Sequence, residues 1–403
     1  MQLIVRPKPY TDESLESYLL RLSQDNGFEC YQVFSGSIKE HLLSTDHDAA
    51  GSFPLALDKV NIYHANRSSA LRLRALSLIE ELTEEVNSRL LQLALMHSSA
   101  TFGATYKSVH RAGTDIPLCF IRTGEIPCCP ACLSESCYAR HYWHYLPYSV
   151  CHTHRRKLLY HCPYCDIALN YIRSESLIYC TCGYDLRHAV LESATESEIM
   201  VSGAVSGDYY DSLNPLLASN NLSMRYGALL WYCTRYISNY NIDLATADLS
   251  LAYDYFNNWP QNFHEELQQL TSDKLLRQTK RINHMSLSDV YETTLADCRQ
   301  LPFRDIEKNF VLDELLKYYI ALVRVNPRKR IPNVADLLLS VIDTACLLST
   351  SVKYVFHLLD DGYLPLAIKP ARAKSITAFF PIFRLREIIE YRLACKPRHN
   401  FSN

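Results

Sequence analysis

The first hundred residues place apolar side chains at a helical period. Near the amino terminus the apolar positions follow one another three and four residues apart, as on one face of a helix: Leu15, Tyr18, Leu19 and Leu22. This spacing predicts a helix over residues 14–24 that is capped by Thr11 or Asp12 and ends near Gly27.

Two further helices are expected in the same region, over residues 31–43 and 69–96. In the longer one the apolar side chains again fall on one face: Ile79, Leu82, Val86, Leu90 and Leu93. Three helices of this kind form either a small packing bundle or a helix-turn-helix-like head that reads DNA. The periodicity alone does not separate these two alternatives.

The composition changes in the middle of the chain. Residues 193–223 are rich in Ser, Gly, Asn and Asp, which is typical of a linker or an irregular crossing. Helical periodicity returns over residues 224–237 and 249–258, and Pro260 favours a new helix start directly after Trp259.

The last hundred residues contain a clearer local pattern. Residues 342–348 and 351–361 predict two short helices joined by a turn at residues 349–350, with Gly362 as the residue that ends the second helix. A short extended wing is expected over residues 363–365. This order of elements is that of a helix-turn-helix.

The second of these helices has an apolar face and a polar face. The polar face carries Ser351, Lys353, Tyr354 and His357. In a DNA-binding helix-turn-helix these positions point to the groove, whereas in other proteins the same face docks a partner or only packs. Residues 317–398 contain 14 Lys/Arg against 6 Asp/Glu, which favours nucleic acid slightly.

The candidate chemistry lies in a cysteine-dense stretch. Nine of the 15 cysteines fall between Cys128 and Cys182, and two Cys-Pro-x-Cys turns there are each followed by a second pair of ligand-type residues. Zinc binds four nitrogen or sulfur ligands in a tetrahedron, and such turns supply two of them. The spacing predicts two zinc ions, held by Cys129, Cys132, Cys151 and His154 and by Cys162, Cys165, Cys180 and Cys182.

Two ligand choices stay open at this point. Cys128 can replace Cys129, and His152 can replace His154. Four protein ligands leave no open coordination position for water or substrate, so we expect both sites to be structural, with binding free energy that contributes to folding. Scattered buried thiols, or two disulfides in a secreted domain, are the alternatives, but two such turns in tandem favour metal.

We expect a protein that is not an enzyme. No P-loop, dinucleotide-binding or H-E-x-x-H motif is present, and the cysteine stretch lacks the H-x-E element of zinc deaminases. A three-carboxylate nuclease stays open, because its ligands need not be close in the chain.

Composition adds little about function but indicates the compartment. The chain has 403 residues, is 48% hydrophobic and carries a net charge of −2, which argues against a protein dedicated to non-specific nucleic-acid binding. There is no signal-peptide pattern and no run approaching 18 apolar residues, so we expect no membrane insertion and a cytoplasmic location.

These patterns predict a mainly α-helical protein in four parts. In this prediction, residues 1–115 form an N-terminal helical, helix-turn-helix-like domain, and residues 116–190 form tandem structural zinc-finger modules. Residues 191–300 are a linker with a helical segment, and residues 301–403 form a basic C-terminal helical domain with a helix-turn-helix.

Three segments together resemble a known family. They are PKPYTDESLESYLLRLSQDNGF at the start, the two cysteine turns with their paired ligands, and the later NNWPQNF. The chain resembles the TniQ family, the target-selection proteins of cut-and-paste transposons, most strongly over residues 7–186.

The length of the chain and its single late helix-turn-helix look most like the TniQ of type I-F CRISPR-associated transposons. That resemblance implies a non-enzymatic adaptor in DNA transposition. It implies a homodimer docked on the crRNA-guided Cascade complex, at the crRNA-processing subunit and the adjacent backbone subunit, which recruits an AAA+ regulator and the transposase. Contact with target DNA would be indirect or weak. The alternative is an autonomous DNA-binding protein that recognises a transposon attachment site.

Overall fold

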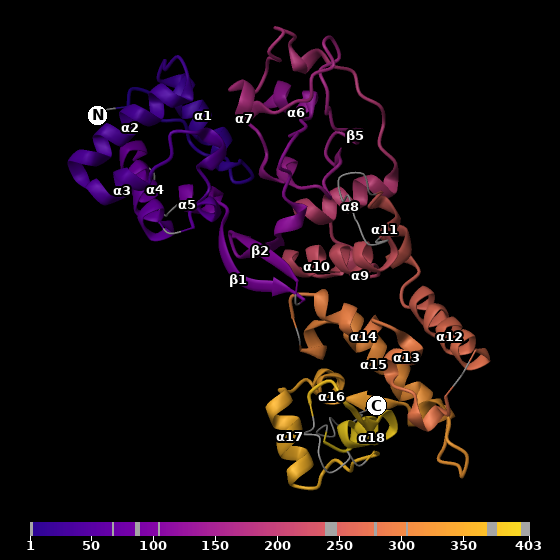
Figure 1. The fold of residues 1–403 in the computed structure, drawn as a ribbon. Helices are drawn as coiled ribbons and strands as arrows, with labels where there is room; N and C mark the ends of the chain where they lie inside the picture. The colour runs from indigo at the N-terminus through magenta and orange to yellow at the C-terminus, as the bar shows by residue number, and fades with distance from the viewer. Residues whose placement is uncertain are drawn as a thin grey trace, which may run out of the picture. The chain divides into compact units, whose positions relative to one another are not determined.

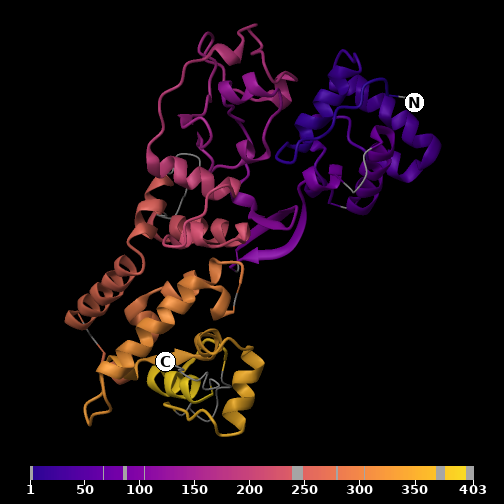
Figure 2. The ribbon, with the colours of Figure 1, turned by 180° about the vertical axis from the view of Figure 1, so that it is seen from behind.

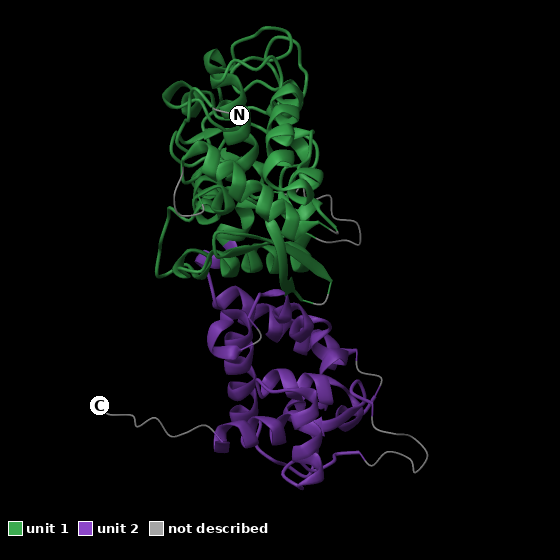
Figure 3. Ribbon diagram, turned by 90° about the vertical axis from the view of Figure 1, so that its left-hand side faces the viewer, with its two compact units in different colours: residues 1–254 green, residues 255–403 purple. Residues whose placement is uncertain are grey.

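The computed structural model describes residues 3–66, 68–84, 89–103, 105–237, 248–277, 280–303, 305–368 and 377–395. The chain forms two compact units, Met1–Asp254 (unit 1) and Tyr255–Asn403 (unit 2), which Figure 3 colours separately. The described part of the chain is mainly helical, which confirms the expectation of a mainly α-helical protein (Figures 1 and 2). Within the described ranges no helix combines the length and the apolar character needed to cross a membrane.

Unit 1 begins with the helices α1 to α5: Leu15–Asp25, Tyr31–Thr45, His47–Ser52, Ser69–Thr83 and Arg89–Leu93. The first two confirm the predicted helices. The predicted cap of α1 is wrong, because Ser14 and not Thr11 or Asp12 occupies that position. The Ser14 side chain accepts a hydrogen bond from the backbone N–H of Ser17.

The predicted helix over residues 69–96 is wrong in its length. α4 ends at Thr83, and Glu84 adopts a left-handed conformation with φ 57°, which stops the helix. Val86, one of the apolar positions of that prediction, lies outside the described residues. Met96 already belongs to a strand.

A three-stranded antiparallel sheet follows, which the helical periodicity does not predict. Its strands are β1 (Met96–Phe102), β2 (Tyr106–Arg111) and β3 (Thr114–Pro117), in the order β1-β2-β3. Ala112 and Gly113, both with positive φ, make the tight turn between β2 and β3. α10, described next, packs against β3.

The predicted linker over residues 193–223 is also wrong. It contains α8 (Glu196–Ser206) and α9 (Pro215–Ala218) and leads into α10 (Leu222–Tyr232), which continues as a π-helix over Cys233–Ile237. α8 starts with a capping box in which the side chains of Thr195 and Glu198 each accept from the other residue's backbone N–H. It packs on α10, so this polar stretch is part of the core of unit 1.

Unit 2 consists of helices around α15. Its elements are α12 (Gln261–Leu276), α13 (Leu287–Tyr291), α14 (Thr294–Asp297), α15 (Phe310–Val325), β6 (Leu338–Ser340), α16 (Val341–Leu347), α17 (Val352–Asp360), β7 (Pro381–Arg384) and α18 (Leu385–Cys395), and α11 (Ser250–Asn257) crosses the boundary between the units. Trp259 stacks on Phe263 and contacts Phe310 edge-on, which fixes α12 against α15.

The two short helices predicted near the carboxyl end are present as α16 and α17, and they pack on each other. Gly362 follows α17 with φ 77°, as expected of a helix-ending glycine. The predicted wing is wrong, because residues 363–365 are not in a strand. The extended partner is β7, which pairs antiparallel with β6.

Candidate metal centres

The first cysteine cluster joins a short helix to a hairpin. Cys129 directly precedes α6 (Pro130–Glu135), with Pro130 at the first helical position, and Cys132 lies in the first turn. Cys151 ends β4 (Val150–Cys151), which pairs with β5 (Arg156–Lys157). The hairpin turn between these two strands carries His154 and brings it beside Cys151.

The four donor atoms of this cluster fit around one metal ion. They all lie within 4.8 Å of one another. The Nδ1 atom of His154 is 3.6 Å from the Cys129 sulfur and 3.3 Å from the Cys132 sulfur, and the Cys132 and Cys151 sulfurs are 3.6 Å apart. A tetrahedron with about 2.3 Å to sulfur and about 2.0 Å to nitrogen has edges of roughly this length.

The orientation of His154 is fixed from outside the cluster. Its Nε2 atom lies 2.9 Å from the carboxylate of Glu135, the last residue of α6. This contact leaves Nδ1 facing the three thiols, in the arrangement by which carboxylates orient metal-binding histidines. The backbone N–H of His154 also donates to the Cys151 sulfur at 3.4 Å, which favours a thiolate there.

The second cluster is built from two tight turns. In the first, the carbonyl of Cys162 accepts from the N–H of Asp166 at 2.9 Å, and in the second, the carbonyl of Cys180 accepts from Gly183 at 2.8 Å. The sulfurs of Cys162 and Cys182 are 3.7 Å apart, and those of Cys165 and Cys180 are 3.6 Å apart. All four again lie within 4.8 Å of one another, so this cluster can also hold one ion.

The two clusters differ in exposure. All three cysteines of the first are buried and only His154 is partly accessible, whereas in the second Cys182 is exposed and Cys165 half-buried. With four protein donors around each centre, the chain leaves no coordination position for a substrate. The arrangement can hold segments of the fold together and offers no metal-bound water for chemistry.

The two open ligand choices have clear structural outcomes. Cys128 is buried outside the cluster, where burial raises the pKa of its thiol, and its backbone pairs with Leu159. His152 is buried too, with Nδ1 2.9 Å from the Tyr148 hydroxyl and Nε2 2.7 Å from Asp208. The hydrogen bond from His152 lowers the pKa of the Asp208 carboxyl. Both ring nitrogens of His152 therefore have other partners.

Two of the three residues in the basic run after the first cluster, Arg155 and Lys157, are paired with acidic residues. Arg155 contacts Glu196, and the ammonium of Lys157 lies 2.9 Å from the Glu192 carboxylate. The guanidinium of Arg156 donates to the Ser193 hydroxyl at 2.9 Å. Two of the three cations are therefore offset by carboxylates, and Arg156 is held by neutral oxygens, so the run forms an edge of the fold with reduced excess charge for nucleic acid.

The polar face predicted on α17 is exposed to solvent. Ser351, Lys353, Tyr354 and His357 are all accessible, while Val355 and Leu358 are buried. Ser351 has a structural task, because its hydroxyl caps α17 by accepting from the N–H of Tyr354 at 3.1 Å. Only the other three side chains are available to a partner.

Residues of the opening motif form a buried network of hydrogen bonds with one ion pair, which we call the polar lock. The motif alone did not indicate it. The Glu13 carboxylate is fully buried and accepts two hydrogen bonds from the Arg21 guanidinium, at 2.8 and 2.7 Å. Ser17 donates to Glu13 and accepts from the backbone N–H of Ala139. Ser14 bonds the hydroxyl of Tyr171 at 2.7 Å. The lock ties α1 to the segments around the metal clusters.

Comparison with known proteins finds a family match in part of unit 1. Residues 4–158 match the family model of TniQ. This match supports a relationship to the TniQ family over the stretch from the opening segment through the first cluster, and it ends before the second cluster. No curated protein matches the chain.

Proposed function

We propose that this protein is a non-enzymatic target-selection adaptor of a CRISPR-associated transposon, most similar to the TniQ of the type I-F systems. The observation that carries the proposal is the match of residues 4–158 to the TniQ family model. The two clusters with four protein donors each support a scaffold and not a catalyst. We assign zinc to both, where it would supply folding free energy to the surrounding turns.

In this role the chain acts as a homodimer on the crRNA-guided Cascade complex, at the crRNA-processing subunit and the adjacent backbone subunit. It recruits the AAA+ regulator and through it the transposase for RNA-guided integration in the cytoplasm. Base pairing with the guide supplies sequence recognition. The near-neutral net charge of −2 supports an adaptor that needs little affinity of its own for DNA.

The test compares binding to purified Cascade with binding to DNA. We expect co-elution with crRNA-loaded Cascade in size-exclusion chromatography, and in a gel shift only weak duplex binding that falls steeply with salt. The matched control is Cascade without crRNA. Tight, sequence-selective binding to a transposon attachment site in the absence of Cascade would contradict the adaptor role.

That outcome would favour the second candidate, an autonomous DNA-binding protein. The observation behind it is the exposed polar face of α17, which follows α16 across a short turn and carries Lys353, Tyr354 and His357. Direct base readout usually enlists Arg, Lys, Asn or Gln at several positions. Lys353 is the one permanently charged side chain of the three, so we infer a docking face.

We therefore expect the variant Lys353→Ala/Tyr354→Ala/His357→Ala to lose association with Cascade or the AAA+ regulator by about tenfold or more, at unchanged DNA affinity. Ser351 is left in place because it caps the helix. Arg324→Ala, at an exposed cation of α15, serves as the control. A variant that binds both proteins normally but loses DNA affinity and salt dependence would instead assign the face to DNA.

A further inference from the structure

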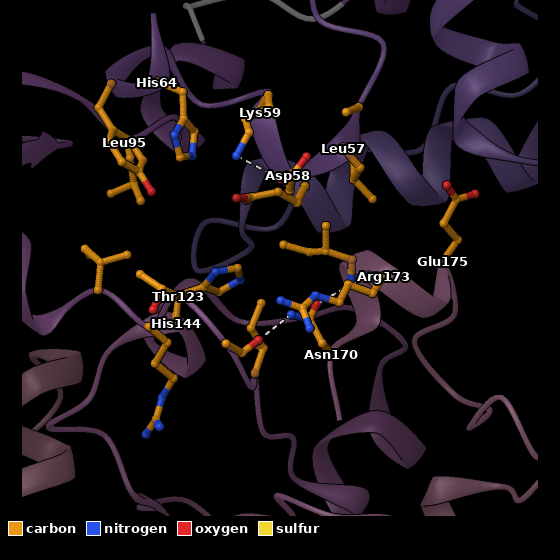
Figure 4. A pocket seen from close by; sticks show the side chains of 18 of the residues that line it. Leu57, Asp58, Lys59, His64, Leu95, Thr123, His144, Asn170, Arg173 and Glu175 are labelled. Atoms are coloured by element: carbon orange, nitrogen blue, oxygen red, sulfur yellow. Dashed lines mark hydrogen bonds and ion pairs between the residues drawn. The ribbon is translucent and has the colours of Figure 1, made fainter. Parts of the chain in front are cut away.

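Unit 1 contains a cavity of about 550 Å³ that is separate from both metal clusters. One wall comes from residues 55–64, and the facing wall comes from residues 121–126 and 170–175 (Figure 4). Its volume lies in the range of pockets that hold a drug-sized molecule or a short peptide segment. The metal-binding stretch and the N-terminal helices therefore enclose a space that the proposed function does not use.

A buried histidine lines this cavity with one ring nitrogen unused. His144 is 5% exposed, and its Nε2 atom lies 2.9 Å from the Tyr171 hydroxyl. Nδ1 has no hydrogen-bond partner among the described residues, and Figure 4 shows the ring directed into the cavity. Burial lowers the pKa of His144 to about 3, so the ring is neutral near pH 7. It offers a bound molecule one hydrogen bond.

The acidic groups of the lining already have partners. Asp58 pairs with Lys59 at 2.9 Å, and the Glu175 carboxylate accepts from the backbone N–H of Tyr31 at 2.7 Å. Glu16 is buried, accepts from Asn61, and has its pKa raised to about 7 by burial. Little negative charge is left for a ligand to meet.

One cation of the lining is unpaired. Arg173 is exposed, and its guanidinium has no hydrogen-bond or ion-pair partner in the described part of the chain. Figure 4 shows it on the wall opposite Lys59. Between the polar groups the walls are apolar, with Leu57, Leu95 and Ile126 among them. The cavity thus combines apolar surface, one neutral hydrogen-bonding group and one available guanidinium.

We propose that this cavity binds an acidic, partly apolar peptide segment of a partner protein. A carboxylate of the segment pairs with Arg173, a main-chain group bonds to His144, and apolar side chains pack on Leu57 and its neighbours. The inference is independent of transposition, because it concerns binding by the isolated chain.

The lining favours a peptide over nucleic acid for two reasons. Single-stranded nucleic acid needs aromatic platforms on which its bases stack. Here the aromatic ring Tyr63 already lies against His64, with centroids 4.0 Å apart. In addition, proteins that bind single-stranded nucleic acid follow its backbone with a positively charged groove, whereas Arg173 is the one available guanidinium among the described residues of this lining.

The test uses a fluorescein-labelled short peptide in which glutamate alternates with leucine, titrated with the full chain and followed by fluorescence anisotropy. A peptide with lysine in place of glutamate is the charge-reversed probe, and labelled oligo(dT) is the nucleic-acid probe. We expect the acidic peptide to bind at least about tenfold more tightly than the other two.

Two variants connect binding to the cavity. Arg173→Ala should lower the affinity for the acidic peptide by about tenfold or more, as expected for loss of a charge-assisted hydrogen bond. Gly124→Leu should also block binding, because Gly124 lines the cavity and a Cβ there meets no atom within 4 Å, so the fold is left intact. Arg277→Ala, at an exposed arginine of unit 2, should change nothing.

Three results would overturn the proposal. They are absence of peptide binding, equal binding of both peptides, and peptide affinity unchanged in both cavity variants. Loss of oligo(dT) binding in these variants, without peptide binding by the wild type, would assign the cavity to nucleic acid instead.

Discussion

Replacing Cys132 by Ser should remove the metal from the first cluster and unfold much of unit 1. A structural zinc site contributes on the order of 10 kcal/mol to the folding of a small module, and most of it depends on a complete ligand set. Cys132 is buried among Cys151, His154 and Cys129, so no water can substitute for its sulfur at low cost. We expect about two zinc per chain in the wild type and aggregation or metal loss in the variant, measured by elemental analysis and circular dichroism.

The matched control is Cys128→Ser. Cys128 is a neighbouring buried thiol outside the cluster, so its replacement should leave both metals in place. A wild-type protein that is well folded and free of metal would refute the proposal that the first cluster binds a structural metal. Metal loss in Cys128→Ser but not in Cys129→Ser would move the ligand to Cys128.

The residues of the clusters could be chosen from the sequence because coordination chemistry restricts them. Four donors must converge within a few ångströms, and short turns of the Cys-Pro-x-Cys type deliver two of them at once. The structure brings together the eight residues named from spacing. Spacing predicted His154 but left His152 open as an alternative ligand. The contacts of the two histidines distinguish them. His152 contacts Asp208, which is distant in the sequence, whereas His154 contacts Glu135 at the end of α6.

Helices with a strong apolar face were predicted well, and elements with other signals were missed. α1 follows from its periodicity. α8 is polar at its start and small in its side chains, so composition indicated a linker, although the capping pair Thr195 and Glu198 was visible in the sequence. The sheet β1-β2-β3 does not follow from the helical spacing, which predicts a helix as far as Met96, the first residue of β1.

The polar lock and the cavity could not be predicted, because both depend on contacts between distant residues. Ser14 and Tyr171 are far apart in the chain, and their hydroxyls are 2.7 Å apart in the fold. Likewise the cavity joins residues 55–64 to residues 170–175. No local pattern encodes such a pairing. The sequence shows only that unusual polar residues, such as Glu13, lie at the start of an amphipathic helix.

The second large effect is expected at this lock. Arg21→Ala should destabilise unit 1 by about 3–5 kcal/mol, because it leaves the Glu13 carboxylate buried without its cation. Glu13 is 0% exposed and Arg21 15% exposed as side chains, so water cannot replace the guanidinium at Glu13. For a unit of this size the loss corresponds to a fall in melting temperature of about 10 °C, measured by circular dichroism in zinc-containing buffer.

Arg74→Ala is the control for loss of an arginine and its ion pair. Arg74 is 54% exposed and contacts Asp46, whose capping of α3 does not depend on it, so we expect a cost of at most about 1 kcal/mol. Equal melting temperatures for Arg21→Ala and Arg74→Ala would show that the lock contributes no more than a surface pair. If Arg21→Ala greatly lowers the melting temperature and Arg21→Lys restores part of it, the restored part is due to the positive charge. The part that Arg21→Lys does not restore is then due to the second hydrogen bond, which lysine cannot make.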